Sequence, residues 1–261
     1  MPDLAWNKSH WGSDYRWPAL GEEWSTAWGG SEPQWFGSLL PRLHRFLPTR
    51  RILEIAPGFG RWTKFLLPAC DEFIGIDLAP KCVSACHERF ASAKHARFIT
   101  NNGQSLSAAR DGYFDLIFSF DSLVHAEHEI LASYIPQAIC KLSAQGVGFI
   151  HHSNLLSCGK TAGIMHGRAK TVSAEVVAEL IKRSGGTVLI QELINWGGDE
   201  RLIDCLTLFA RHGAYPSVKA VQLKNPSFMK EATLIRQFQS HYSKIVEEPQ
   251  VENIEKFASV G

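Results

Sequence analysis

Short apolar runs alternate with segments of helical spacing between residues 51 and 212. The apolar runs predict strands over residues 52–55, 72–76, 96–100, 114–120 and 147–150. The segments between and after them predict helices over residues 61–68, 80–90, 130–142 and 173–184. Two further runs, 187–194 and 203–211, flank a turn and predict a closing antiparallel pair. Because strands that alternate with helices form a parallel sheet covered on both faces, we expect a doubly wound α/β fold.

The chain before this region has a different composition. Residues 1–50 hold six of the eight tryptophans, interleaved with glycine and proline, so long helices are not expected before Glu32. Two interpretations are open: a satellite core packed on the main domain, or a lid that closes over a ligand with flat aromatic walls. Trp24 and Trp28, at i, i+4 spacing, are the candidate substrate-binding residues.

The chain after this region is expected to form an extension that contains one helix. Residues 213–261 contain one good helical pattern, from Pro226 to about Lys244, and then an end that looks frayed. We therefore divide the chain into a Trp-rich lid or cap segment (1–50), a central cofactor-binding domain (51–212) and a C-terminal helical extension (213–261).

Composition narrows the classes of partner. The formal net charge is +1, which gives no reason to expect a nucleic acid or a membrane surface as partner. No apolar run approaches the ~20 residues of a membrane span, and Met1-Pro2-Asp3 does not begin a signal peptide. The six cysteines are scattered and include no C-x-x-C pair, so we expect reduced thiols in a cytoplasmic protein. The sequence does not determine the oligomeric state.

The first predicted strand and helix are joined by a glycine turn, Pro57-Gly58-Phe59-Gly60. Glycines let the backbone approach a nucleotide closely, and Asp77 at the end of the next strand can accept both ribose hydroxyls. The dinucleotide pattern G-x-G-x-x-G fails because position 63 is threonine. Glu54, at the tip of the first strand, would repel a pyrophosphate but attract the α-amino group of S-adenosylmethionine (SAM). The turn therefore predicts SAM as cofactor, with S-adenosylhomocysteine (SAH) as the product.

Four ordered motifs resemble those of class I SAM-dependent methyltransferases, over roughly residues 45–212: Glu54 to Gly60, Asp77, Asn102-Gly103, and Phe114 to Asp121. Ala56 replaces the usual first glycine, and asparagine replaces the usual acid after the third strand, where it can still bond the adenine. The resemblance implies a seven-stranded Rossmann-like sheet of order 3-2-1-4-5-7-6 with one antiparallel strand. It also implies a set of cofactor-binding residues: Glu54, Ala56, Pro57, Gly58, Gly60, Arg61, Asp77, Leu78, Asn102, Gly103, Phe120 and Asp121.

A narrower resemblance concerns the acceptor. Three segments, 23–30, 120–125 and 149–154, resemble a bacterial subgroup whose members accompany surface-polysaccharide and other sugar-modifying enzymes. This resemblance implies O-methylation of a small acceptor, most plausibly a sugar or nucleotide-linked sugar.

Polar residues that follow the fourth and fifth strands should flank the reactive end of the cofactor, because ligands of doubly wound sheets lie outside the carboxyl ends of the strands. Methyl transfer to oxygen needs positioning and removal of the hydroxyl proton, for which histidine is suited near neutral pH. His125 and His152 are the leading candidate bases, with Asp121 orienting one of them or binding an acceptor hydroxyl. His151 is a further candidate, although alternation along a strand should point one of the two adjacent histidines into the packing. Arg168 is a candidate for binding a phosphate or carboxylate of the substrate with its guanidinium fork.

A divalent metal is an alternative use of the same groups. Asp121, His151, His152 and Asp204 offer the mixed oxygen and nitrogen ligands of Mg²⁺ or Mn²⁺. No compact ligand motif such as H-E-x-x-H is present, so a metal is possible but not expected.

Two other functions remain open. The first is an NAD(P)-dependent oxidoreductase on a similar sheet, against which Thr63 and Glu54 count. The second is a SAM-binding module without turnover, against which the histidines after the fourth and fifth strands count. The leading hypothesis is a SAM-dependent O-methyltransferase with a histidine general base.

Overall fold

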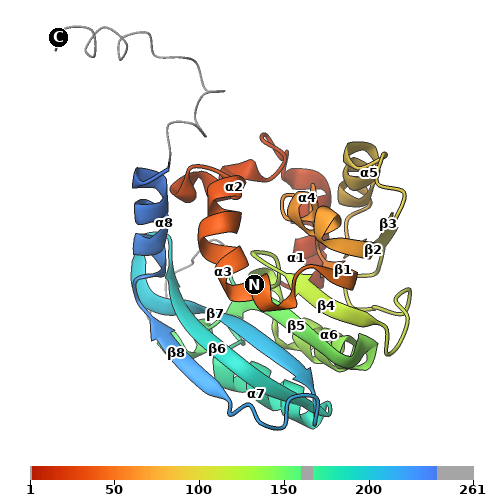
Figure 1. Ribbon diagram of the computed structural model, residues 1–261. Coiled ribbons are helices and arrows are strands. Elements are labelled where there is room, and N and C mark those ends of the chain that lie inside the picture. Colours follow the sequence, from red (N-terminus) through yellow and green to blue (C-terminus); the bar gives the residue numbers. More distant parts are fainter. Residues whose placement is uncertain (1, 160–166, 240–261) are drawn as a thin grey trace, which may run out of the picture.

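The computed structural model describes residues 2–159 and 167–239, which form an eight-stranded sheet with helices on both faces (Figure 1). The strands lie in the order β3-β2-β1-β4-β5-β7-β6-β8. Strand β7 is antiparallel to its neighbours β5 and β6, and the other pairs are parallel. Their bounds are β1 Thr49–Ile55, β2 Cys70–Asp77, β3 Ala96–Thr100, β4 Phe114–Ser119, β5 Leu142–Ser153, β6 Gly186–Trp196, β7 Asp199–Arg211 and β8 Val221–Asn225.

The Rossmann-like α/β class is confirmed, but the predicted number of strands is wrong. The order of the first seven strands agrees with the expectation, and β8 extends the sheet beyond β6. This strand lies in the C-terminal extension, just before the one helix predicted there, and no element was predicted at its position. Its sequence, Val-Gln-Leu-Lys-Asn, alternates apolar and polar residues with period two, a strand pattern that the prediction overlooked.

Short helices precede β1, and longer helices connect the later strands. The α-helices are α1 Leu4–Ser9, α2 Ser31–Gln34, α3 Leu40–Leu43, α4 Thr63–Leu66, α5 Pro80–Arg89, α6 His128–Lys141, α7 Ala174–Arg183 and α8 Phe228–Gln237. Tighter or wider helical turns are η1 His10–Asp14, η2 Glu22–Trp28, η3 Trp35–Leu39, η4 His44–Phe46, η5 Leu67–Ala69, η6 Leu123–His125 and η7 Leu155–Cys158. The predicted helix over 61–68 is therefore a single α-turn followed by a 3-10 turn.

The sheet separates two apolar cores, and neighbouring residues of one strand belong to different ones. Ile52 of β1 packs in the core beneath the N-terminal helices, α5 and α8. Leu53 packs in the other core, beneath α6 and α7 (Figure 1). Because both faces are covered, the central strands are apolar almost throughout, which explains why the sequence pattern could predict them.

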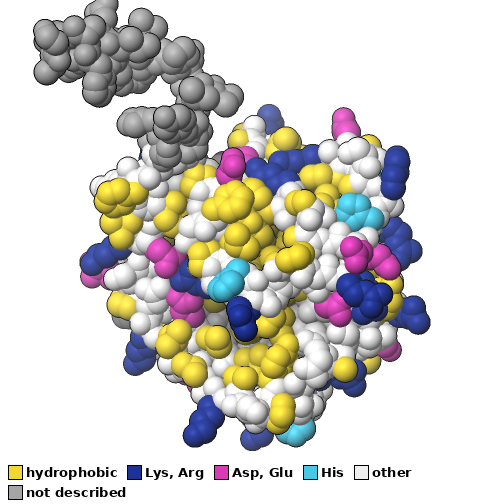
Figure 2. Space-filling view, in the orientation of Figure 1, with side chains coloured by type: hydrophobic (Ala, Val, Ile, Leu, Met, Phe, Trp, Pro, Cys, Tyr) yellow, Lys and Arg dark blue, Asp and Glu magenta, His cyan; other side chains and the backbone are white. Residues whose placement is uncertain are grey.

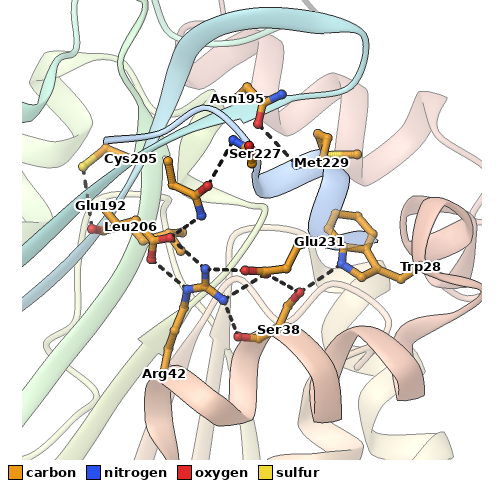
Figure 3. A network of polar contacts seen from close by, with 11 residues as sticks. Trp28, Ser38, Arg42, Glu192, Asn195, Cys205, Leu206, Ser227, Met229 and Glu231 are labelled. Carbon is orange, nitrogen blue, oxygen red and sulfur yellow. Dashed lines mark hydrogen bonds and ion pairs between the residues drawn. The ribbon is translucent and has the colours of Figure 1, made fainter. Parts of the chain in front are cut away.

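A partly buried polar network joins the N-terminal helices, β6 and α8 (Figure 3). Arg42 donates two hydrogen bonds of 2.7 Å to Glu192 and two of 3.1 Å to Glu231. Ser38 bonds Glu231 at 2.8 Å and accepts the indole N–H of Trp28 at 3.0 Å. Bidentate arginine–carboxylate pairs of this kind fix orientation as well as distance. The network therefore attaches α8 to the cap segment and to the sheet.

The molecular surface agrees with the nearly balanced charge. Figure 2 shows basic and acidic side chains interspersed over one face. In the described part of the chain, no helix has the length and apolar character needed to cross a membrane.

Candidate active site

A cavity of about 300 Å³ lies at the carboxyl ends of β1, β2 and β4. Residues 55–58, 76–78, 120–123, 125 and 126 form one side of it, and residues of the N-terminal segment between Leu4 and Thr26 form the other. The carboxyl ends of parallel strands meet at one edge of the sheet, which is where ligands of doubly wound folds bind. We refer to this space as the central cavity.

The turn after β1 is bent by three residues with positive φ: Ala56 at 56°, Gly58 at 58° and Gly60 at 83°. Asp77 at the end of β2 holds this turn, because its carboxylate accepts the N–H groups of Gly58 at 3.0 Å and Ala79 at 2.9 Å. Burial raises the pKa of Asp77 to about 6, although the backbone hydrogen bonds lower it. Asp77 is thus ionised at neutral pH and lies in the cavity wall.

Glu54 lies in a different place from the one expected. Its side chain is 2% exposed, lies beneath the turn rather than in the cavity wall, and accepts the Thr63 hydroxyl at 2.5 Å. Burial raises the pKa of Glu54 to about 8, so the carboxyl group is largely protonated at neutral pH. The prediction that Glu54 attracts the amino group of SAM is therefore corrected: it is a neutral support for the turn. Thr63, in the position of the missing third glycine, is its partner.

The turn after β3 also differs from the expectation. Asn102 is exposed, and its side-chain oxygen accepts the N–H groups of Gln104 and Ser105, both at 2.9 Å. It therefore caps the turn and does not line the cavity, whereas Gly103 does. Sequence reasoning missed Tyr134 of α6, which lines the cavity and receives a 2.9 Å hydrogen bond from Asn101. A tyrosine on the otherwise apolar buried side of a predicted helix is the feature that could have revealed it.

Two oppositely charged residues meet in the cavity wall. Asp121 follows β4 in the left-handed conformation, with φ of 60°, and its carboxylate lies 2.8 Å from Nη2 of Arg61. Arg61 also donates to the hydroxyl of Ser25 in the cap segment at 3.2 Å. Asp121, Arg61 and Phe120 all line the cavity.

His125 lies in the cavity wall with one ring nitrogen engaged. Nδ1 is 2.9 Å from the carbonyl oxygen of Gly167, so Nδ1 carries the proton and Nε2 carries a lone pair. Among the described residues, Nε2 has no hydrogen-bond partner. Burial lowers the pKa of His125 to about 4, and the indoles of Trp6 and Trp11 lie 6.2 and 5.0 Å from its ring. The ring is therefore neutral at pH 7 and able to accept a proton.

His151 and His152 are inside the sheet. Both are fully buried on β5, opposite Leu206 and Cys205 of β7, and neither lines the cavity. The His152 ring donates to the Ser153 carbonyl at 2.9 Å and accepts from Thr207 at 2.7 Å, so both nitrogens are occupied. The prediction of His152 as a base is therefore wrong for this geometry.

His151 lies between the backbone of Asp121 and the carboxylate of Asp204. Its Nδ1 accepts the backbone N–H of Asp121 at 3.2 Å, and its Nε2 lies 3.2 Å from Asp204 without good alignment for a hydrogen bond. The prediction that His151 takes part directly in catalysis is also wrong for this geometry, because the side chain is 0% exposed. It supports the backbone of the residue that does face the cavity.

The candidate metal ligands do not form a metal site. The carboxylate of Asp204 is occupied by Arg168, at 2.7 Å, and His152 is bonded within the sheet. Within residues 2–159 and 167–239, no group of three histidine, cysteine or acidic side chains is arranged to hold a metal ion.

Of the three predicted substrate-binding residues, Arg168 and Trp24 line the central cavity, but Trp28 does not. Trp28 is 1% exposed and packs with Trp196 and Phe228 in the core. The proposed substrate-binding role of Trp28 is therefore corrected to a packing role. Trp196, at the end of β6, lines the cavity.

The cap segment covers the turn that follows β1. Trp17 stacks on Phe59 at 4.7 Å, and a methyl group added to Gly58 would lie 2.7 Å from the Trp17 ring. Asn7 donates to the backbone carbonyl of His125 at 3.0 Å. Residues far apart in the sequence thus close the cavity from the side opposite the strands.

Residues 52–146 match a family model described as a methyltransferase domain. The match spans the glycine turn, Asp77, Asp121 and His125, which are the parts of the chain that form the central cavity. The chain carries a SAM-dependent methyltransferase domain. No curated protein sequence matches it significantly.

Solved structures show the same fold. A SAM-dependent methyltransferase from Clostridium acetobutylicum is 15% identical with a TM-score of 0.56, over 72% of this chain and 92% of that one. The N-methyltransferase NodS from Bradyrhizobium japonicum, in complex with SAH, is 18% identical with a TM-score of 0.56, over 80% and 98%. The PH0226 protein from Pyrococcus horikoshii is 21% identical with a TM-score of 0.53, over 67% and 88%.

The central cavity of this methyltransferase fits the cofactor. Its volume is at the lower end of the range for small-molecule sites, ~300–1,000 Å³. Asp77 offers an ionised carboxylate for ribose hydroxyls, and the close contact between Gly58 and Trp17 leaves no space for a side chain at the turn. Leu78, Ile130 and Tyr134 supply the apolar wall that a purine requires.

Proposed function

We propose that this methyltransferase modifies a hydroxyl group of a small acceptor, a sugar or nucleotide-linked sugar, with His125 as the general base. The observation that carries the proposal is the state of the His125 ring. Its Nδ1 donates to the Gly167 carbonyl, and its Nε2 lone pair is available in the cavity wall. A positioned neutral histidine of this kind contributes ~10²–10⁴-fold to a proton transfer.

SAM, when bound, supplies an electrophilic methyl group. His125 would accept the hydroxyl proton at Nε2 while the hydroxyl oxygen takes up that methyl group. The electron pair of the broken sulfur–methyl bond would stay on sulfur, which makes SAH the neutral product. The negative charges of Asp121 and Asp204 favour the protonated ring, while burial and the positive charge of Arg168 oppose it. His125 is thus neutral before the transfer and has carboxylates near it that stabilise the charge it gains.

The cavity walls support a sugar acceptor. Trp11, Trp24 and Trp196 present flat aromatic surfaces, and Asp121 and Arg168 add polar atoms to the same lining. Small-molecule sites combine such walls with a few polar groups that fix orientation. A sugar ring, with apolar C–H faces and polar edges, matches this arrangement.

Residues 1–50 are proposed to act as a lid over residues 51–212, since Trp17 and Asn7 reach the glycine turn and His125. A lid of this kind must open to admit the cofactor. Trypsin digestion tests this: SAH should slow cleavage in the first 20 residues, and unchanged cleavage would contradict it.

The test of the function is turnover with wild-type enzyme on three groups of acceptors: methyl glycosides, nucleotide-linked sugars and the amino sugar glucosamine, with SAH release as the measurement. Methylation of glycoside or nucleotide-sugar hydroxyls is expected. NodS is an N-methyltransferase, and methylation of the amine alone would replace this proposal with N-methylation. A thermal shift with NAD but not with SAM or SAH would instead support an oxidoreductase.

A further inference from the structure

The two chain neighbours of Arg168 are hydrogen-bonded to the segment that follows β4. The carbonyl of Gly167 accepts the Nδ1 proton of His125 at 2.9 Å. The N–H of Ala169 donates to the carbonyl of Val124 at 2.8 Å. These two backbone contacts place Arg168 beside His125, and both side chains line the central cavity.

The guanidinium of Arg168 is paired from behind by Asp204. Nε lies 2.7 Å from Oδ1 and Nη2 lies 2.7 Å from Oδ2, and the two residues are 4% and 0% exposed. Burial raises the pKa of Asp204, but the positive charge of Arg168 outweighs this and holds the pKa well below its usual value. The Asp204 carboxylate therefore stays charged. The positive charge of Arg168 is thus balanced inside the protein.

The third nitrogen of the guanidinium is available. In the described part of the chain, Nη1 makes no hydrogen bond, and the ring of Trp196 lies 5.5 Å from the guanidinium carbon. Nη1 carries two N–H donors and no acceptor. The wall therefore offers a donor, at Arg168, next to an acceptor, at Nε2 of His125.

This pair matches two adjacent hydroxyl groups. A hydroxyl both donates and accepts, so one hydroxyl can accept from Nη1 while its neighbour donates to Nε2. A phosphate or carboxylate only accepts, so it would face the Nε2 lone pair without a bond. It would also meet a guanidinium whose charge Asp204 already balances, and a buried charge without compensation is unfavourable.

We propose that Arg168 and His125 recognise a vicinal diol on an uncharged part of the acceptor, Arg168 binding the hydroxyl that does not react. This rests on the proposed O-methylation and names the chemical class of the acceptor. It replaces the sequence-based expectation that Arg168 binds a phosphate or carboxylate. Arg168 contacts the acceptor and Asp204 is a positioning residue, which holds the fork of Arg168 from within the sheet.

The experiment compares the full chain with its Arg168→Gln variant on matched probes: methyl glucopyranosides, their monodeoxy analogues, glucose phosphates and glucuronate. SAH release gives kcat and KM, and SAH affinity is measured separately. The wild-type enzyme is expected to accept the intact glycoside, to prefer it to the charged analogues, and to lose at least about tenfold in kcat/KM when the neighbouring hydroxyl is absent. Arg168→Gln is expected to raise KM about tenfold, with a smaller change in kcat, and to lose the discrimination between glycoside and deoxyglycoside.

The controls separate folding from recognition. Arg183→Gln changes an exposed arginine of α7, 75% exposed at its side chain, and should behave as wild type. If Arg168→Gln does not fold because it leaves Asp204 unpaired, the double variant with Asp204→Asn removes both charges and is subjected to the same comparison. Rejection of deoxyglycosides that persists in either variant would overturn the assignment.

Preference of the wild-type enzyme for glucose phosphates or glucuronate would also overturn it, while leaving O-methylation in place. The proposed function fails differently: wild-type enzyme would methylate the amine of glucosamine and no hydroxyl on any probe. That result would overturn both proposals together.

Discussion

The segment that follows β4 contains His125, and the end of β5 contains His152. The sequence alone could not show which of the two histidines faces the cavity. His125 and His152 are both buried, and burial lowers the pKa of each to about 4. They differ in backbone path. After β4 the chain turns at Asp121, with φ of 60°, and residues 121–125 pass along the cavity. Strand β5 instead continues to Ser153 and pairs with β7 up to that point.

The difference shows that a perturbed pKa does not by itself locate a base. Burial causes the same shift in both histidines, but only His125 keeps a nitrogen without a partner in the described structure. Geometry must be met before the pKa matters. The same contrast between a cavity residue and a buried counterpart recurs for Trp24 and Trp28, and for Asp77 and Glu54.

The largest expected effect is on turnover. His125→Gln should lower kcat by about 10²–10⁴-fold, because the proton acceptor is lost. His152→Gln should keep kcat within about threefold of wild type, because its ring bonds only Ser153 and Thr207 inside the sheet. Steady-state kinetics on a glycoside acceptor provide the measurement, with SAH affinity as a control for folding. Equal losses in both variants would remove the distinction between the two segments.

The tryptophan pair should separate stability from acceptor binding. Trp28→Ala should cost about 3–5 kcal/mol of unfolding free energy, because a core side chain that is 1% exposed is removed. Trp24→Ala, at a side chain 38% exposed, should cost about 1 kcal/mol and raise the acceptor KM instead. Urea unfolding and acceptor kinetics are the readouts. A Trp28→Ala protein of normal stability would contradict the packing role.

Acid should destabilise the protein through both histidines alike. Each has a pKa of about 4 when folded against 6.5 for the free group, so the unfolded chain binds more protons between these values. Stability from each is fully present above pH 6.5 and is lost as the pH falls towards 4. Between pH 7 and pH 5 each should contribute a loss of about 2 kcal/mol.

Unfolding in urea at the two pH values tests this expectation. His125→Gln and His152→Gln should each show a smaller acid-induced loss than wild type. An undiminished loss in both variants would mean that neither histidine is held neutral.

The smallest expected effect concerns the acidic pair at the cofactor end. Asp77→Asn should weaken SAH binding about tenfold or more, because an ionised carboxylate in the cavity wall is replaced. Glu54→Gln should change it less than about threefold at pH 7, because Glu54 is largely protonated there and bonds only Thr63. Calorimetry with SAH measures both. A large loss in Glu54→Gln would restore the original prediction that this acid binds the cofactor.

Local sequence patterns were sufficient to predict much of the fold. Strands buried on both faces are apolar throughout, and a short turn brings Gly58 next to the β2 end that bears Asp77. These features depend on neighbouring segments, so sequence periodicity and glycine spacing were sufficient. Strand β8 also has a local period-two pattern, but only a helix from Pro226 onward was predicted in the extension.

The acceptor side depends on contacts between distant residues. Whether His152 faces the cavity is decided by the pairing of β5 with β7, which extends beyond the predicted end of the strand at residue 150. Whether Trp28 packs or binds is decided by α8, some 200 residues later, whose Phe228 contacts it. Neither partner is visible in the local sequence around these residues.

The most direct test of the account is to locate the methyl group on a product. Wild-type enzyme is given [methyl-¹³C]SAM and glucosamine, which offers hydroxyls and an amine in one molecule, and carbon–proton correlation spectra identify the labelled atom. If His125 is the base for O-methylation, the O-methyl resonance appears with His152→Gln and is lost with His125→Gln. A label on nitrogen, or an O-methyl product that His125→Gln forms as fast as the wild-type enzyme does, would contradict this role of His125.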